Sequence, residues 1–218
     1  MELIKFAYYM LIVTSSLIKL VNCSNLDDID KSDDISQIIE ARGFICETHY
    51  ITTGDGYILG NYRIVNPLVS QSISSFSGQK LKPIVMQSCL LGSAVDFIIN
   101  SPRGFVNSSI LKSYNSLDSI DFDLDGRNLG FILANLGYDV WLTNPRGNKY
   151  SSNHTTLDPR KGKIIKIRNN LKTINYDYLD MKQFWSFSLD EMANIDLPAI
   201  IDYVLNVTDQ GKLIVQIL

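Results

Sequence analysis

Three apolar runs, separated by two segments of helical periodicity, constrain the fold of this 218-residue chain more than any other feature. The runs are PIVMQSCLL from Pro83, YDVWLTN from Tyr138 and KLIVQIL from Lys212. Continuous apolar stretches of this length are typical of strands that a parallel sheet buries on both faces. The helical segments repeat apolar side chains at spacings of three and four, in Leu129, Ile132, Leu133 and Leu136 and again in Leu197, Ile200, Ile201, Val204 and Leu205. This alternation of strand and helix predicts an α/β fold.

The region before these runs predicts an antiparallel start to the same sheet. CETHYITTGDGYILGNYRIV, residues 46–65, contains two alternating β-rich runs around GDG, which is typical of a hairpin. A short helix is predicted upstream in SQIIEARGF, ending at Gly43. We therefore expect one domain, an antiparallel N-terminal hairpin followed by a largely parallel sheet with flanking helices. With 45% hydrophobic residues the chain can form one sizeable core.

The first 23 residues have the layout of a secretory signal peptide. Lys5 precedes an apolar run of about 13 residues, from Phe6 to Ile18, and small or polar residues follow it. The run is shorter than the roughly 18 residues of a membrane-spanning helix, so we favour cleavage over a permanent anchor. Lys19 interrupts the run and leaves the cleavage point open. The expected division is a signal peptide, residues 1–23, and one domain, residues 24–218.

Charge and cysteine content argue against two classes of protein. The net charge of −3 becomes about −4 once Lys5, Lys19 and Glu2 leave with the signal peptide, so nucleic acid is not an expected partner. Two cysteines then remain, Cys46 and Cys89, too few for a disulfide scaffold. One disulfide between them is possible, or each is a small apolar side chain.

Three glycosylation sequons follow the signal peptide. They are Asn107 in NSS, Asn153 in NHT and Asn206 in NVT. Asn107 and Asn153 lie in polar, loop-like sequence, and Asn206 lies near the end of a predicted helix. All three agree with passage through the secretory pathway.

Five stretches within residues 35–215 carry a resemblance to a known family. They are RGFICETHYITTGDGYILGNYRI, KPIVMQSCLLGSAVDF, LGFILANLGYDVWLTNPRGNKYS, FWSFSLDEMANIDLPAIIDYVL and GKLIV. In content and order they resemble the N-terminal half of the acid lipases of the gastric and lysosomal type. GYDVWLTNPRGN and FWSFSLDEMANIDLPA are the most specific of them. The resemblance implies a partial α/β-hydrolase fold, truncated at the strand that delivers the nucleophile.

Ester hydrolysis in this fold uses a serine in a G-x-S-x-G turn, then an aspartate and a histidine further along the chain. The resemblance places that serine one position beyond Leu218, and no G-x-S-x-G occurs in the 218 residues. His49 and His154 both precede that position, and we interpret them as structural. No catalytic residue is assigned, and the chain is expected to be inactive in ester hydrolysis.

The resemblance also implies one half of an oxyanion hole. The family has His-Gly after its third strand, before a leucine whose backbone N–H faces the oxyanion. Ser88 and Cys89 occupy those two places here and Leu90 follows, so Leu90 is the expected remnant of the hole. A Cβ at position 89 disfavours a backbone with positive φ. A nucleophilic role for Cys89 is not favoured, because no histidine is placed to activate its thiol.

No metal or cofactor is expected. DFDLDG, Asp121 to Gly126, opens like a calcium loop, but position twelve of that loop is Ile132, where a glutamate is needed. RKGKIIKIRNNLK, Arg160 to Lys172, is a basic insertion that we interpret as solvated, with contact to an anionic lipid surface as the alternative.

The expected function is therefore that of an acid-lipase-like protein of lipid metabolism, secreted or lysosomal, whose partner is a neutral lipid or a lipid surface. The family activity would be hydrolysis of triacylglycerols or cholesteryl esters. Two alternatives stay open: a secreted, non-catalytic protein that binds a lipid or another partner, and a partial product of a longer lipase gene. The residues QIL after GKLIV depart from the family pattern and favour the second of these.

Overall fold

A computed structural model describes residues 32, 34–70, 80–89, 91–106, 127–160 and 176–217, with side chains from residue 179 onward in the last range. The expected signal peptide, Leu90, Asn107, the acidic DFDLDG stretch and nearly all of the basic insertion lie outside these residues. Within the described ranges, no helix is long and apolar enough to cross a membrane.

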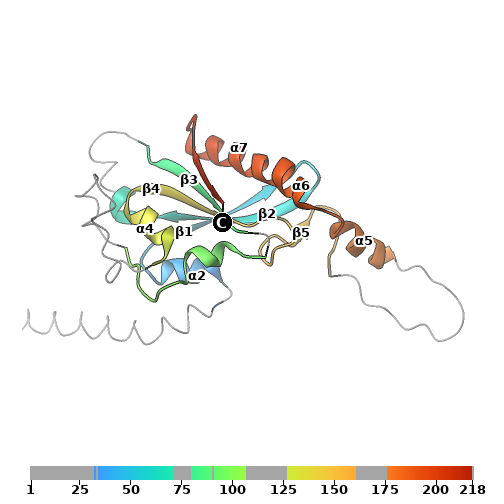
Figure 1. Ribbon diagram of the computed structural model, residues 1–218, viewed down its shortest axis with the longest axis horizontal. Helices are drawn as coiled ribbons and strands as arrows, with labels where there is room; N and C mark the ends of the chain where they lie inside the picture. The colour runs from blue at the N-terminus through green and yellow to red at the C-terminus, as the bar shows by residue number, and fades with distance from the viewer. Residues whose placement is uncertain are drawn as a thin grey trace, which may run out of the picture.

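The described strands form one mixed sheet (Figure 1). Its order is β1-β2-β4-β3-β6, with β5 paired to β2 off this path. The strands are β1 (Ile45–Thr52), β2 (Tyr57–Val65), β3 (Lys82–Gln87), β4 (Tyr138–Thr143), β5 (Asn153–His154) and β6 (Ile214–Ile217). β3 pairs in parallel with both β4 and β6, whereas β2 pairs antiparallel with β1, β4 and β5. The predicted α/β class, with its antiparallel start and parallel continuation, is confirmed.

The predicted hairpin is β1 and β2. Its register joins Ile45 to Val65 at one end and Thr52 to Ile58 at the other. Gly56 has φ +99°, a conformation open to glycine, and its N–H donates to the carbonyl of Thr53 at 3.0 Å. The turn therefore forms at GDG because glycine can adopt the positive φ that the turn requires.

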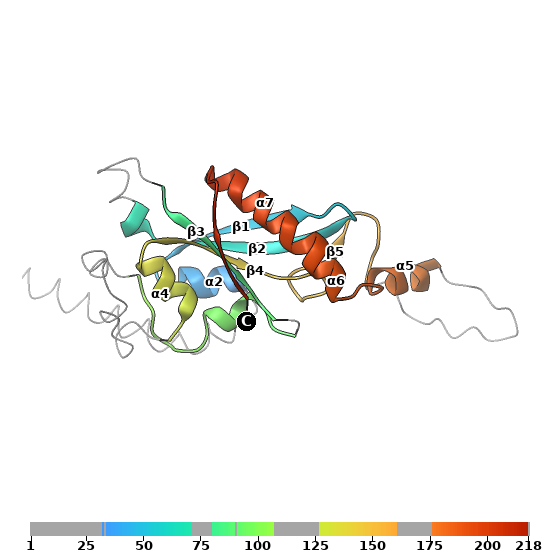
Figure 2. The same cartoon turned by 45° about the horizontal axis from the view of Figure 1, so that its top comes forward.

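Helices cover both faces of the sheet. On one face lie α2 (Ile35–Glu40), the short 3-10 helix η1 (Ala94–Phe97) and α4 (Leu129–Asn135). On the other lies α7 (Leu197–Thr208), as the turned view in Figure 2 makes clear. α5 (Tyr176–Phe184) extends from the body, and α6 (Leu189–Glu191) leads through a π-helical turn, η4 (Met192–Asp196), into α7.

Alternate residues of each strand supply the two cores. Ile84, Met86, Val140 and Leu142 pack with α2, η1 and α4. Val85 and Trp141, which lie between them along the strands, pack with Ile200 and Val204 of α7. Burial on both faces explains why these strands read as unbroken apolar runs.

Two of the three apolar runs differ from expectation. The first, PIVMQSCLL, leaves the sheet after Gln87, because Ser88 and the residues that follow turn away as a loop. The third was expected to be a buried strand, and this was wrong: Ile214, Val215 and Ile217 are 45%, 37% and 57% exposed. Among the described residues only β3 pairs with β6, so β6 is an edge strand there.

Candidate functional site: the carboxyl edge of the parallel strands

The loops that carry the sequence motifs meet at the edge of the sheet where β3, β4 and β6 have their carboxyl ends. The chain leaves β3, passes through α4 on one face and returns as β4. It then passes through α7 on the opposite face and enters the sheet as β6, on the other side of β3. In open α/β sheets, ligands bind at the carboxyl ends of strands where the strand order reverses in this way.

The loop after β3, residues 88–93, begins in the sheet and ends at η1. Ser88 is buried, and its Oγ donates to the carbonyl of Thr143 at 3.4 Å. Cys89 is exposed, and its carbonyl accepts the N–H of Gly92 at 3.1 Å, which closes a turn. Leu90, the expected oxyanion donor, lies outside the described residues.

The far end of this loop is fixed by a capping box. The N–H of Ser93 donates to Asp96 Oδ2 at 2.9 Å, while the Ser93 hydroxyl accepts the N–H of Val95 at 3.3 Å. A methyl group on Gly92 would lie 2.3 Å from Asp96 Oδ2 and 2.9 Å from Cys89 Sγ. Glycine at position 92 thus allows the turn and the cap to pack against each other.

The loop after β4 contains the NPRGN motif, and its asparagines hold the loop after β3. Asn144, fully buried, accepts the N–H of Ala94 at 2.9 Å and donates to the carbonyl of Gly60 at 2.8 Å. Asn148 donates to the carbonyl of Gly92 at 2.7 Å. Both asparagines therefore bind main-chain atoms at the η1 end of residues 88–94.

Arg146 of the same motif is the centre of a buried charge cluster. Its side chain is 1% exposed and forms bidentate hydrogen bonds with Asp55 of the hairpin turn, at 2.6 and 3.0 Å. Its Nε and one Nη donate to Asp196 Oδ1 at 2.9 and 2.7 Å, and its backbone N–H donates to Asp196 Oδ2. The guanidinium also lies over the ring of Tyr57, 4.0 Å from its centroid.

The electrostatics of this cluster favour the ionised groups. Burial opposes the charge of Arg146, but the hydrogen bonds that it donates to Asp196 and Asp55 outweigh this effect and raise the pKa of the guanidinium. Burial likewise opposes ionisation of Asp55, but the bonds from Arg146 and Thr53 lower the pKa of that carboxyl below its usual value. We interpret the cluster as structural, because every carboxylate oxygen of Asp55 and Asp196 accepts a hydrogen bond from Arg146 or Thr53.

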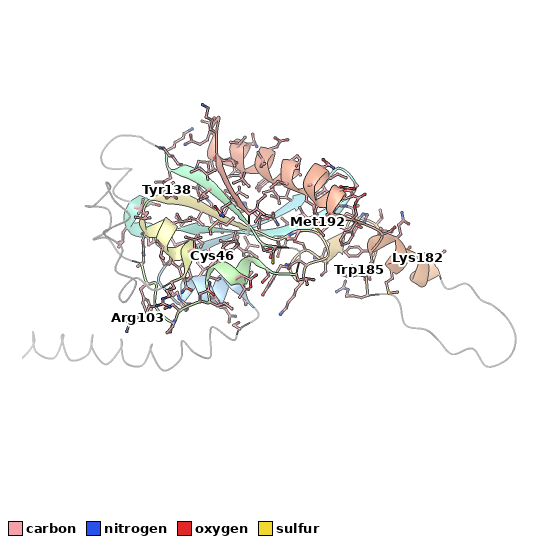
Figure 3. All side chains as sticks on the ribbon, in the orientation of Figure 1. Cys46, Arg103, Tyr138, Lys182, Trp185 and Met192 are labelled. Carbon is pink, nitrogen blue, oxygen red and sulfur yellow. The ribbon has the colours of Figure 1, made fainter. Side chains whose placement is uncertain are left out.

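The FWSFS segment closes over the NPRGN loop. Gly147 has φ +78°, and a Cβ there would lie 2.5 Å from the ring of Phe187 and 3.0 Å from that of Trp185. The Tyr57 hydroxyl donates to the carbonyl of Phe184. Figure 3 places Trp185 where α5 joins the body. The two most specific stretches of the sequence, more than 30 residues apart, thus form one contact around Arg146.

Both histidines contact neighbouring parts of the fold. His154 accepts the N–H groups of Thr156 and Leu157 at Nδ1, each at 3.0 Å, and its Nε2 faces the carbonyl of Asp55 at 3.0 Å. His49 lies on Trp141, with Nδ1 3.1 Å from the Tyr203 hydroxyl of α7 and Nε2 3.4 Å from Glu47. Neither lies in the loops after β3 and β4 that form the carboxyl edge.

The cysteines are free thiols in different surroundings. Cys46 lies against α2 (Figure 3), 3.6 Å from the Ser36 hydroxyl, and burial raises the pKa of its thiol to about 11. Cys89 is exposed in the loop after β3. The disulfide that the sequence left open is therefore absent between these two. In the described ranges no group of three histidine, cysteine or acidic side chains could hold a metal ion.

Two of the three sequons are described, and both asparagines are exposed. Asn153 lies in β5 and lines a hollow of about 240 Å³ formed by residues 153–160. Asn206 lies in the last turn of α7. Asn107 lies outside the described residues.

Comparison with known proteins gives a consistent result. Residues 35–101 match the model of a family described as the partial alpha/beta-hydrolase lipase region. The chain is 35% identical to the gastric triacylglycerol lipase of Bos taurus over 185 residues, which is 84% of this chain and 34% of that protein. It is 34% identical to human lipase member M over 82% of this chain and 31% of that protein. A Crotalus adamanteus protein whose name includes "lysosomal acid lipase/cholesteryl ester hydrolase" is 34% identical over 89% of this chain and 38% of its own length.

This chain belongs to the acid lipase family. It spans about a third of the length of the curated relatives that it matches. The resemblance carried by the five sequence stretches is confirmed, and so is the partial α/β-hydrolase fold.

Ser88 and Cys89 occupy the places where the resemblance described above implies His-Gly. Among the described non-glycine residues Asp209 alone has a positive φ, so Cys89 adopts an ordinary backbone conformation. A side chain at this position is therefore compatible with the loop as it is folded here.

Proposed function

We propose that this acid-lipase chain provides the scaffold and the first oxyanion donor, the N–H of Leu90, of a domain for carboxylic ester hydrolysis of neutral lipids. We further propose that residues 1–218 alone do not hydrolyse esters. The observation that best supports this proposal is a hydrogen bond between the two motif loops at the carboxyl edge of the parallel strands. Asn148, in the loop after β4, donates it to the carbonyl of Gly92, in the loop after β3.

The substrate class is supported by the relatives. Their names describe a triacylglycerol lipase and a cholesteryl ester hydrolase, both of which cleave esters of neutral lipids. Since the chain spans about a third of such proteins, the whole activity is a proposal for the domain and not for this segment of it.

The proposed inactivity of the 218 residues follows from the groups that they contain. They have no G-x-S-x-G sequence, and their two histidines are held by backbone groups, in His154, and by the Tyr203 hydroxyl, in His49. Ser88, the serine nearest the proposed oxyanion donor, is buried and donates to Thr143. An oxyanion donor without a nucleophile and base gives little turnover.

An assay with a chromogenic short-chain ester tests this proposal. Purified protein should release nitrophenol from p-nitrophenyl butyrate no faster than a matched blank. The double variant Ser88→Ala with Cys89→Ala serves as the control for adventitious nucleophiles at the edge. Turnover above the blank that this double variant abolishes would overturn the proposed inactivity.

A second candidate function, non-catalytic binding of a lipid or another partner, is favoured by β6. Its apolar side chains Ile214, Val215 and Ile217 are exposed, and an edge strand can pair with added structure. Flotation with a triacylglycerol emulsion tests it, with Ile217→Glu as the variant and the exposed Val207→Glu of α7 as the control. Binding that Ile217→Glu abolishes and Val207→Glu preserves would favour this function, provided that light scattering shows a defined soluble species.

We also propose that the chain enters the secretory pathway, with residues 1–23 as a signal peptide and residues 24–218 as the mature domain. Exposure of Asn153 and Asn206 supports their use as glycosylation sites, and Asn107 is proposed from sequence alone. The names of relatives, which describe a gastric and a lysosomal lipase, agree with this route. Digestion with peptide N-glycosidase, followed by intact mass, tests each site in turn with an Asn→Gln variant.

A further inference from the structure

The short strand β5 and the residues that follow it, up to position 160, lie against the hairpin of β1 and β2. β5 pairs with β2 through two residue pairs, Tyr57 with His154 and Ile58 with Asn153. The N–H of Thr155 adds one backbone bond, to the carbonyl of Gly56 at 2.9 Å. A strand of two residues provides little backbone pairing, so side-chain contacts decide how firmly this segment is held.

The imidazole of His154 supplies several of these contacts. Its Nδ1 lies 3.0 Å from the backbone nitrogens of both Thr156 and Leu157, and its Nε2 lies 3.0 Å from the carbonyl oxygen of Asp55. A backbone N–H can only donate, and a carbonyl can only accept. Nδ1 is therefore the unprotonated nitrogen, and Nε2 carries the hydrogen. The closed segment thus binds one tautomer of the neutral ring.

The ring of His154 is also packed against aromatic side chains. It meets the ring of Tyr57 edge-on at a centroid distance of 4.9 Å, and that of Phe184 at 6.4 Å. A Cβ on Gly56 would lie 2.8 Å from its Cε1 and 2.9 Å from its Nε2. Leu157, whose N–H the ring accepts, packs against the core beneath α7. The imidazole therefore fills the space between the hairpin turn and the segment that it binds.

The charged side chains around His154 are paired with one another. The carboxylate of Asp55 is bound to Arg146 at 2.6 Å. Asp158 and Arg160 line the same hollow as His154 and form an ion pair at 3.3 Å. Both carboxylates are therefore paired with an arginine, and the hydrogen bonds at Nδ1 and Nε2 decide which form of the ring the closed segment binds.

Protonation of the ring would place a hydrogen on Nδ1. A protonated imidazole has two donors and no acceptor, so the N–H groups of Thr156 and Leu157 would face a third donor. Hydrogen bonds to the neutral form favour that form. They are complete above the range in which histidines commonly titrate, about pH 5 to 8, and are lost as the pH falls through it. His154 is only half-buried, so a proton can reach it without unfolding of the domain.

We propose that His154 is an acid-released latch, which holds residues 154–157 on the hairpin turn while its ring is neutral and frees them when the ring is protonated. The opening is local, because β1 and β2 pair from Ile45 to Thr52 without any bond from His154. This latch goes beyond the proposed ester hydrolysis and does not depend on it.

The second histidine of the chain provides an internal comparison. His49 Nδ1 lies 3.1 Å from the Tyr203 hydroxyl, and its Nε2 lies 3.4 Å from a carboxylate oxygen of Glu47. A hydroxyl and a carboxylate can both accept, so a protonated ring keeps both contacts. Because the chain has two histidines, one variant of each assigns a histidine response to its residue.

Three variants separate the latch from other effects of acid. His154→Asp replaces Nδ1 by a carboxylate, which accepts nearby N–H groups as in an Asx turn and stays ionised between about pH 5 and pH 7.5. This variant should stay closed. His154→Phe keeps an aromatic ring against Tyr57 but has no acceptor, so it should stay open. His49→Gln is the control, in which the latch should respond as in the wild type.

Amide hydrogen exchange of the full chain is the measurement, expressed as protection relative to the intrinsic exchange rate at each pH. In the wild type, protection of the Thr156 and Leu157 amides should fall on the order of tenfold between about pH 7.5 and pH 5, since their bonds to Nδ1 are lost. The amides of β1 and α7 should keep their protection. His154→Asp should remain protected at both pH values, and His154→Phe should be unprotected at both.

Three results would overturn the proposal. Equal protection of Thr156 and Leu157 at both pH values in the wild type would show that protonation does not release them. A fall that persists in His154→Asp would assign the response to another group. An equal fall in β1 and α7 would show acid unfolding of the whole domain and no local latch. None of these results involves ester turnover, so the proposed function can fail in its own assay while the latch stands.

Discussion

Arg146 joins two carboxylates that lie about 140 residues apart in the sequence, Asp55 in the hairpin turn and Asp196 in the π-helical turn. The sequence shows each of these residues inside a specific motif but gives no sign that they meet. Pairing of a buried arginine with particular acids is a tertiary contact, and neither periodicity nor spacing encodes it. Burial of Arg146 was the missing signal, because a fully buried guanidinium needs carboxylate partners.

Removal of one of these partners should be costly. Asp196→Asn leaves a neutral group of the same shape against a buried cation, and we expect the free energy of unfolding to fall by about 3 kcal/mol. Urea denaturation followed by tryptophan fluorescence measures it. Asp209→Asn is the control, since the Asp209 side chain is 88% exposed in its pair with Lys80 and its loss should leave the free energy of unfolding nearly unchanged. Equal losses of unfolding free energy in the two variants would show that the Arg146 cluster does not stabilise the fold.

Asp55 should give the cluster a dependence on pH. The pKa of Asp55 is lower in the folded chain than its ordinary value of 3.8, so its contribution to stability is present above pH 4 or so. That contribution is lost as the pH falls through the lowered pKa. Asp55→Asn should therefore flatten the fall in unfolding free energy as the pH drops below about 4, measured by urea denaturation at each pH. An unchanged slope in Asp55→Asn would contradict the assignment.

At the scale of elements, the strands and helices that the sequence predicted are those with a strong period. The hairpin, the helices at residues 129–135 and 197–208 and the strands β3, β4 and β6 follow from apolar patterns and from turn residues. The two-residue strand β5 and the short helices η1 and α6 have too few residues to show a period. The π-helical turn arises next to Pro198, which has no N–H and cannot continue the bonding pattern of the preceding turn.

The loop after β4 passes very close to β2, and we predict that this contact limits the size of the residue at position 60. A Cβ on Gly60 would lie 2.3 Å from the carbonyl oxygen of Tyr150, a backbone atom that cannot move without its loop. Gly60→Ala should therefore lower the free energy of unfolding by about 2 kcal/mol. Gly54→Ala, in the same hairpin and with no atom within 4 Å of the added methyl, should change it little. Thermal unfolding by circular dichroism compares the two, and similar midpoints would refute the close-contact explanation.

At the scale of the whole molecule, the sequence identified the family and the order of strand and helix, but it did not reveal how the site is assembled. The strand from Pro83 was expected to continue through Leu91, whereas it ends at Gln87; Asn148 bonds Gly92 and Asn144 bonds Ala94 in the segment that follows. The hydrogen bonds of asparagine side chains to main-chain carbonyls have no sequence signature of their own. From the sequence alone, NPRGN shows only a resemblance to the family. The structure shows the physical role of the motif, which is to hold neighbouring segments through Asn144, Arg146 and Asn148.

The central proposal is that these 218 residues form an acid-lipase scaffold that carries an oxyanion donor and contains no reactive serine. Labelling with a fluorophosphonate probe, followed by intact mass and peptide mapping, tests it most directly, since such probes modify only activated serines. The account predicts that native and heat-denatured protein show the same unlabelled mass. Stoichiometric modification of a single serine in the native chain alone, abolished by heat denaturation, would contradict it.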